Sequence, residues 1–230
     1  MIDEDRVIEA LSTVRDPELD QPITELKFVE GLELAGESVR VRLRLPTYFC
    51  APNFAYLMAA DAKAAVCSVE GVGDVSVTLV DHFASDEINQ GLSLGDGFEQ
   101  TFSGLATGEL TDLRDIFTRK AFIARQGRLC SALLARGRTL HDLAVMRLED
   151  LPPSGEVEIY LERRRELGLD ASPEAPLLLN PAGKPIPEDE VAAHLRFART
   201  VGVSIEANAG LCRSLLATRY GIPDPEEATP

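Results

Sequence analysis

The sequence is poor in the residues that build familiar catalytic centres. It contains only three histidines among 230 residues, so a Ser-His-Asp triad or a metal site made of several histidines has little material. It also lacks the GxSxG, P-loop and HExxH motifs and the glycine fingerprint of dinucleotide-binding folds. These absences favour a non-catalytic role over an enzyme.

Basic residues and long hydrophobic runs are also scarce. Lysine and arginine number 23 against 38 acidic residues, which gives a formal net charge of −15. Sequence-independent binding of nucleic acid and docking on an anionic membrane both need many cations, so this charge argues against both partners. The longest uncharged stretch, residues 45–60, contains prolines and is too short to span a bilayer.

Cysteine is rare and never paired in the sequence. The acidic N-terminus lacks the basic-then-apolar order of a signal peptide, and no CxxC motif joins the four cysteines Cys50, Cys67, Cys130 and Cys212. No sequence signal therefore directs these thiols to an oxidising compartment. The sequence predicts a cytoplasmic protein with reduced cysteines.

The composition changes between residues 84 and 110. This segment contains five acidic residues, five glycines and no basic residue. We therefore predict an acidic, glycine-containing linker at residues 84–110, between a first domain at 1–83 and a second domain at 111–222, with a frayed tail at 223–230. A long surface loop within one domain is the alternative.

The first domain is predicted to mix helices and strands. Apolar spacing indicates a helix, two strands, a second helix and a third strand, in that order, at residues 4–14, 26–34, 39–45, 51–69 and 75–79. The clearest pattern is the second strand, where valine and leucine alternate with Arg40, Arg42 and Arg44. Gly31 marks an irregularity in the first strand. We expect the first two strands to form a hairpin and the second helix to cover one face of the sheet.

The second domain is predicted to be mainly helical. Periodicity and flanking glycine or proline indicate five helices, at residues 113–135, 139–145, 156–167, 188–201 and 206–220. The expected fold class is therefore α+β: a small helix-strand-strand-helix-strand domain followed by a mainly α-helical domain.

One thiol, that of Cys50, lies in a corner between a loop and a helix, where the thiolate form of cysteine is favoured. Cys50 precedes Pro52, a residue suited to the first turn of a helix. The helix dipole and the free N–H groups of that turn favour a thiolate, the form of cysteine that attacks or binds metal. Thr47 can position this loop through its hydroxyl. We expect Cys67, Cys130 and Cys212 to be buried among apolar neighbours and inert.

A metal at Cys50 would need ligands from elsewhere. Cys67 is 17 residues further along, roughly 25 Å away on the same predicted helix, so these two thiols cannot hold one metal within a monomer. The loop with Asp16 and Glu18, another subunit or a client protein could supply the missing ligands. His82, after the third strand, is a weaker second ligand, and a polar cap at the strand end is its alternative role.

A set of motifs resembles a known family. In order along the chain, the motifs are Val14-Arg15-Asp16-Pro17-Glu18-Leu19, the alternating strand, Pro46-Thr47 followed by Cys50-Ala51-Pro52, Gly71-Val72, and Val75-Ser76-Val77. Over about residues 4–83, this set resembles the small iron–sulfur (metal–sulfur) cluster assembly family, which contains the SufT-type maturation factors and the PaaD-like proteins of phenylacetate oxidation. The resemblance implies an accessory role in assembling or delivering iron–sulfur centres.

The resemblance also assigns site residues. The family cysteine falls on Cys50, its preceding threonine on Thr47, and its acidic loop on Asp16 and Glu18. The chain departs from the family pattern around the cysteine, which Phe49 precedes and Ala51 separates from proline. Residues 111–230 also lack the cysteine-rich module that PaaD-like proteins can carry.

The leading hypothesis is a maturation factor that handles an iron–sulfur cluster or iron transiently. Its partners would be cluster-assembly proteins and a client apo-enzyme, and the PaaD-like resemblance points to a multicomponent oxygenase as the client class. One thiol per chain is too few for a stable cluster, so a homodimer, or the chain and its client, would share the cluster through Cys50. A thiol-dependent enzyme with Cys50 as nucleophile and a metal-free interaction adaptor are the alternatives.

Overall fold

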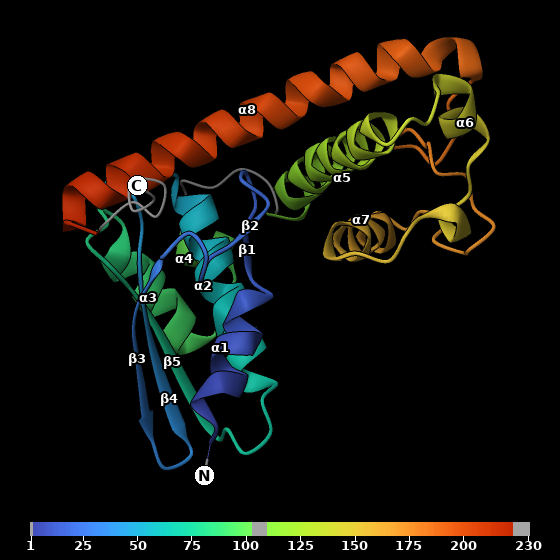
Figure 1. The fold of residues 1–230 in the computed structure, drawn as a ribbon. Coiled ribbons are helices and arrows are strands. Elements are labelled where there is room, and N and C mark those ends of the chain that lie inside the picture. The colour runs from blue at the N-terminus through green and yellow to red at the C-terminus, as the bar shows by residue number, and fades with distance from the viewer. Residues whose placement is uncertain (1, 103–109, 223–230) are drawn as a thin grey trace, which may run out of the picture. The chain divides into compact units, whose positions relative to one another are not determined.

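The computed structural model describes residues 2–102 and 110–222 (Figure 1). The predicted tail at 223–230 and part of the predicted linker, residues 103–109, lie outside the described residues. The chain forms two compact units. Unit 1 combines Met1–Asp112 with Asn208–Pro230, and unit 2 is Leu113–Ala207.

A three-stranded sheet forms the framework of unit 1. Its order is β3-β4-β5, and the strands are β3 (Val29–Ala35), β4 (Ser38–Arg44) and β5 (Asp74–Val80). Strands β3 and β4 form an antiparallel hairpin closed at Gly36, whose φ of 66° is one that glycine adopts without strain. Strand β5 runs parallel to β4, which requires a crossover connection. The predicted hairpin, crossover and irregularity at Gly31 are confirmed.

The two faces of β4 have the predicted burial. Val39 and Val41 are fully buried and Leu43 is 2% exposed, while the intervening arginines lie on the opposite face. The Arg42 guanidinium extends over β3 and pairs with Glu30 at 2.6 Å and Glu33 at 3.0 Å. A Cβ atom at Gly31 would lie 2.7 Å from this guanidinium, so the small residue leaves room for the arginine.

Helices cover the apolar face of the sheet (Figure 1). Helix α1 packs against α2, and α2 and α3 pack against β5; their bounds are α1 (Glu4–Ser12), α2 (Pro52–Cys67) and α3 (Ser85–Leu94). Two short strands follow α1 and pair with each other, β1 (Arg15–Asp16) and β2 (Gln21–Pro22). This β-ladder was not anticipated from the sequence, because two-residue strands have no detectable periodicity.

The segment expected to be a linker contains helices. Besides α3, it includes α4 (Phe98–Thr101), and both belong to unit 1. Ile88 and Leu92 are buried in the core of this unit, and the Asn89 side chain bonds both backbone groups of Leu79, at 2.7 and 2.9 Å. Gly95 closes α3 with a φ of 76°, so here a glycine marks a helix end.

Unit 2 is helical, as predicted. It contains most of α5 (Leu110–Ala135), then α6 (Leu140–Val145), the short 3₁₀ helix η1 (Leu148–Asp150), α7 (Gly155–Glu166), and the first part of α8 (Glu188–Tyr220). A buried glutamine, Gln126, donates from its side-chain amide to the Tyr160 hydroxyl at 2.8 Å and to two backbone carbonyls, those of Leu177 and Leu179. These bonds tie α5 to α7 and to the extended segment after it.

Helix α8 is continuous where the sequence suggested two helices, so the predicted break between residues 201 and 206 is wrong. The break was inferred around Gly202, but one glycine weakens a helix by only about 1 kcal/mol. Residues on both sides of Gly202, namely Ala198, Ile205 and Ala209, are buried, so the helix packs against other residues before and after this glycine. The overall fold class, α+β followed by a mainly helical region, is confirmed. Among the described residues, no helix is long and apolar enough to cross a membrane.

Candidate functional site

Cys50 lies in the corner between β4 and α2. Strand β4 ends at Arg44, and α2 begins at Pro52 with Ala51 in the N-cap position. Pro52 carries no N–H, and the Phe54 N–H in the first turn of α2 donates to the Asn53 side chain at 2.9 Å and to the Ala51 carbonyl at 3.1 Å. Cys50 is half-buried and packs against the core of unit 1. This is the corner that the sequence predicted.

Thr47 contacts the thiol directly. Its Oγ1 lies 3.2 Å from Cys50 Sγ and accepts the backbone N–H of Phe49, also at 3.2 Å. Because a lone pair of Thr47 Oγ1 accepts the Phe49 N–H, the Thr47 hydroxyl proton is able to point toward Cys50 Sγ. A hydroxyl donor of this kind stabilises negative charge on the thiol and fixes its direction.

His82 holds the backbone of the corner. The Ala84 N–H donates to Nδ1 at 3.2 Å, so the proton resides on Nε2, which donates to the Cys50 carbonyl at 2.7 Å. His82 is only 2% exposed, and burial lowers its pKa, which keeps the ring neutral at pH 7. Both ring nitrogens are therefore engaged, and His82 acts as the polar strand-end cap.

The acidic loop after α1 folds around a buried carboxylate. Asp16 Oδ1 accepts the N–H groups of Glu18 and Leu19, both at 2.9 Å. Burial raises the pKa of Asp16 to about 6 against the opposing effect of these two bonds, and the charge of Glu18 raises it further. The Glu18 side chain instead accepts a bond from the Asn208 amide of α8, at 3.2 Å.

A second cysteine, Cys212, comes close to this loop from α8. We expected it to be buried and inert, but it is only partly buried. Its pKa is raised to about 11, mainly by burial and also by the charges of Asp16, Cys50 and Glu18. Asn208, one turn before Cys212 on α8, bonds Glu18, so α8 reaches the acidic loop. The only trace in the sequence is that Asn208 and Cys212 are four residues apart, and so on one helix face.

The end of α8 is bonded to the strands that carry the corner. Arg219 donates to the carbonyl of Leu45 at 3.3 Å and to that of Asp81 at 2.7 Å. The Tyr220 ring lies beneath two guanidinium groups, Arg44 at 4.6 Å and Arg219 at 5.0 Å. These contacts join α8 to the loops on both sides of Cys50.

Three aromatic rings surround the corner at its surface. We call Tyr48, Phe49 and Phe83 the aromatic cluster; their ring centroids are 5.1 to 6.3 Å apart. Phe49, the neighbour of Cys50, is 77% exposed. An exposed group of large apolar side chains is typical of a surface that contacts another molecule.

The remaining thiols lie away from this corner. The expectation that Cys67 is buried is wrong: it is exposed at the last position of α2. On α2 it is Val66, the preceding residue, that points into the core and is fully buried. Successive residues of a helix point about 100° apart, so Cys67 points away from the core. Cys130 is buried, as expected, and burial raises its pKa to about 12. Within residues 2–102 and 110–222, no three side chains of histidine, cysteine, aspartate or glutamate converge on a metal position.

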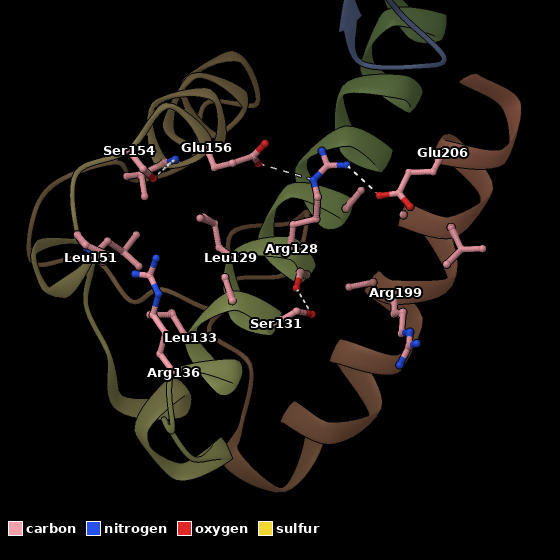
Figure 2. A pocket seen from close by; sticks show the side chains of 18 of the residues that line it. Arg128, Leu129, Ser131, Leu133, Arg136, Leu151, Ser154, Glu156, Arg199 and Glu206 are labelled. Atoms are coloured by element: carbon pink, nitrogen blue, oxygen red, sulfur yellow. Dashed lines mark hydrogen bonds and ion pairs between the residues drawn. The ribbon is translucent and has the colours of Figure 1, made fainter. Parts of the chain in front are cut away.

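Unit 2 contains a separate pocket of about 730 Å³. It is lined by residues of α5, α7, α8 and the segment before α7, and its size is typical of small-molecule sites. Figure 2 shows Arg128 between Glu156 and Glu206, with ion-pair distances of 3.7 and 3.8 Å. Apolar side chains also line the pocket, among them Leu129 and Leu133 of α5. The predicted site residues belong to unit 1 and the pocket to unit 2.

Comparisons with known proteins concern the residues that build the corner. Residues 4–79 match the family described as iron-sulfur cluster assembly protein. The chain is 36% identical over 73 residues to an iron-sulfur cluster carrier protein of Deinococcus radiodurans, a match that covers 32% of this chain and 20% of that relative. The chain is also 34% identical over 91 residues to an uncharacterized protein of Methanocaldococcus jannaschii. That match covers 39% of this chain and 94% of the relative.

The extent of these matches is unequal. The chain spans about a fifth of the length of the carrier protein and nearly all of the archaeal relative. No solved structure matches the chain. The family match includes the acidic loop, Thr47, Cys50 and α2. Through these residues, the chain belongs to the iron–sulfur cluster assembly protein family.

Proposed function

We propose that this chain is an accessory factor that takes part in the assembly of iron–sulfur clusters and passes a cluster or iron to a client apo-enzyme, with Cys50 as the residue that contacts this cargo. The observation that carries the proposal is the position of Cys50. It is a half-exposed thiol within the family match, oriented by Thr47 at 3.2 Å and held through its carbonyl by His82 at 2.7 Å.

The corner suits reversible binding of iron. Thiolates are the usual protein ligands of iron–sulfur clusters. The Thr47 hydroxyl, 3.2 Å from Cys50 Sγ, can donate a hydrogen bond to sulfur, and such bonds tune a bound metal centre. The neutral His82 adds no positive charge that would compete with iron.

The ligand supply favours transfer over storage. A stable cluster is commonly held by four cysteines, whereas the family match contains only two, Cys50 just before α2 and Cys67 at its last position. A cluster in transit would therefore be shared with the client, with an assembly protein or with a second copy of this chain. An open, incomplete ligand set lets the acceptor replace ligands one at a time.

The aromatic cluster supports a protein as the partner. Phe49 and its two neighbours expose apolar surface beside the thiol, and aromatic side chains are enriched at protein interfaces. Resemblance to PaaD-like proteins favours a multicomponent oxygenase as the client class. Because the site requires free thiols, we further propose that the protein works in a reducing compartment, the cytoplasm.

An anaerobic transfer assay tests this function. The chain would be loaded with iron and sulfide, and transfer to apo-ferredoxin as a probe acceptor would be followed by circular dichroism. We expect Cys50→Ser to lower both bound iron and the transfer rate at least about tenfold, because it removes the ligand that contacts the cargo. Cys67→Ser is the matched control and should behave like the wild type, since Cys67 is an exposed thiol at the far end of α2. Transfer by Cys50→Ser at the wild-type rate would disprove the proposal.

A further inference from the structure

We propose that the pocket of unit 2 binds a small organic acid, a molecule with an apolar body and one carboxylate, and that Arg136 pairs with this carboxylate. Every residue that lines the pocket lies between Ala124 and Glu206, and therefore within unit 2. The site is separate from the proposed function, which concerns Cys50 of unit 1, so either can be disproved alone.

Apolar side chains make up much of the pocket wall. Four of them belong to the hydrophobic core of unit 2 and are 7 to 8% exposed, namely Leu129, Leu133, Leu151 and Val157. Two prolines and a valine extend this lining, Pro152, Pro153 and Val203. Small-molecule sites have such apolar walls together with a few polar groups that orient the ligand. The apolar wall would hold the body of the ligand by removing it from water.

A buried glycine faces the free space of the pocket. Gly202 of α8 lines the pocket and is buried, yet no described atom lies within 4 Å of a Cβ atom built on it. Protein interiors are close-packed, so a buried position with no atom in front of it borders a real cavity. A side chain at position 202 would therefore extend into the free volume of about 730 Å³.

Charges on one side of the pocket balance one another. Glu156 of α7 lies 2.9 Å from Arg125 and 3.7 Å from Arg128, and Arg128 lies 3.8 Å from Glu206 of α8. Two arginines thus face two carboxylates. These ion pairs link α7, α5 and α8 on one side of the pocket (Figure 2). They obstruct the path of a continuous polymer segment on that side, which favours a small molecule as the ligand.

Two further arginines of the lining have no carboxylate partner. Within residues 2–102 and 110–222, neither Arg136 nor Arg199 forms an ion pair. Two uncompensated positive charges therefore border one pocket of a chain whose net charge is −15. Such a site attracts an anion, and a guanidinium matches a carboxylate through two parallel hydrogen bonds. The charge of the pocket thus selects an acid.

Arg136 is better placed than Arg199 for this contact. It follows the last residue of α5, where its N–H donates to the Leu133 carbonyl at 3.1 Å and Gly137 has a φ of 90°, an arrangement that fixes a helix end. In Figure 2 the Arg136 guanidinium extends toward Leu151, whereas that of Arg199 points away from both leucines. An acid whose body lies against Leu133 and Leu151 would place its carboxylate beside Arg136.

Binding of octanoate tests the charge and the apolar body together. Two probes with the same chain are the controls: 1-octanol, which is uncharged, and octylammonium, which is positively charged. By isothermal titration calorimetry we expect one octanoate to bind per chain, and both controls to bind at least about tenfold more weakly, because neither presents a carboxylate to a guanidinium. Equal binding of either control, or no binding of octanoate, would overturn the inference.

Replacement of Arg136 tests the assigned partner. We expect Arg136→Gln to weaken octanoate binding about tenfold, because a charge-assisted pair is lost, and to leave 1-octanol binding unchanged. The matched control is Arg138→Gln, which removes an exposed arginine two positions later that does not line the pocket. Wild-type octanoate affinity in Arg136→Gln, or a larger loss with Arg199→Gln, would contradict the role of Arg136.

Filling the pocket from the protein side tests its location. Gly202→Leu should weaken octanoate and 1-octanol binding alike, at least about tenfold, because the leucine occupies the apolar space. Gly210→Leu is the control: Gly210 also lies in α8, and a Cβ atom there also meets no described atom within 4 Å, but it does not line the pocket. Far-ultraviolet circular dichroism would check that both variants are folded. Undiminished binding by folded Gly202→Leu would place the ligand elsewhere and overturn the inference.

A measurement on the wild-type chain avoids any effect of substitution on folding. In methyl NMR spectra, octanoate should shift the resonances of Leu129, Leu133, Leu151 and Val157, which line the pocket. The methyl groups of Leu45 and Val77, in the core of unit 1, should be unaffected. Shifts confined to unit 1 would overturn the inference.

Discussion

The four cysteines differ in the two properties that control alkylation, which are exposure and thiol pKa. Cys67 is exposed at the end of α2, Cys50 and Cys212 are half-buried, and Cys130 is buried. Burial raises the pKa of Cys130 to about 12 and that of Cys212 to about 11. The reactive species is the thiolate, so these two residues should react slowly.

Limited alkylation of the folded protein should therefore follow a definite order. With iodoacetamide near pH 7.5, we expect Cys67 and Cys50 to be modified first, Cys212 later, and Cys130 only after unfolding. A rise in pKa from 9.0 to about 11 leaves about a hundredfold less Cys212 thiolate near neutral pH. Peptide mapping by mass spectrometry measures the order. Modification of Cys130 in the folded chain, or of Cys212 before Cys67, would contradict it.

At the scale of helices, two glycines of unit 2 have opposite surroundings. A Cβ atom at Gly127 of α5 would lie 2.8 Å from Ala198 Cβ of α8, so this glycine permits close packing of the two helices. No described atom lies within 4 Å of a Cβ atom built at Gly202 of α8. Both residues lie within helices and line the same pocket, which makes them a matched pair.

Alanine at these two positions should change stability in opposite directions. Gly202→Ala should raise the free energy of unfolding by about 0.5–1 kcal/mol, because alanine is the better helix former and meets no neighbour. Gly127→Ala should lower it by about 1–3 kcal/mol, because α5 and α8 must move apart. Urea unfolding followed by far-ultraviolet circular dichroism measures both. Stabilisation by Gly127→Ala would show that the two helices are not held in contact.

At the scale of the molecule, unit 1 is assembled from two distant parts of the chain. The family match ends at residue 79, yet Ala209 and Leu216 of α8 complete the hydrophobic core around it. Unit 2 lies between these two parts of unit 1 in the chain. The contacts that α8 makes in this core therefore join residues far apart in sequence. The same arrangement of the chain brings α8 to the acidic loop, through Asn208 and Glu18, and to the carbonyls of Leu45 and Asp81, through Arg219.

The contribution of α8 to unit 1 can be measured with two leucines. Leu216 is 2% exposed, and Leu211, five residues earlier in the same helix, is 59% exposed. We expect Leu216→Ala to lower the stability of unit 1 by about 2–5 kcal/mol, as for other buried leucines. Leu211→Ala should change it by less than about 0.5 kcal/mol. Hydrogen exchange of the β4 and β5 amides reports on unit 1 specifically. Equal protection in the two variants would mean that α8 adds nothing to this core.

Local pattern determined much of unit 1 without the structure. The alternation of apolar residues with Arg40, Arg42 and Arg44 specifies which side of β4 is buried, because side chains of a strand point to opposite faces in turn. The order of elements then follows from short-range connections. The position of Cys50 before α2 is also a local property, since Pro52 marks the first turn of the helix.

Long-range packing decided the rest. Whether Cys67 or its neighbour Val66 points inward depends on which face of α2 meets the sheet, and the composition of α2 is apolar nearly all round. The helices of the predicted linker form because Ile88 and Leu92 find a core to enter. No sequence pattern links Asn208 of α8 to Glu18 of the acidic loop, because their hydrogen bond joins residues 190 positions apart in the chain. The sequence alone therefore determined which face of β4 is buried and where the Cys50 corner lies. Only the tertiary structure decided what surrounds that corner, because a contact between two distant segments leaves no periodic pattern in the sequence of either segment.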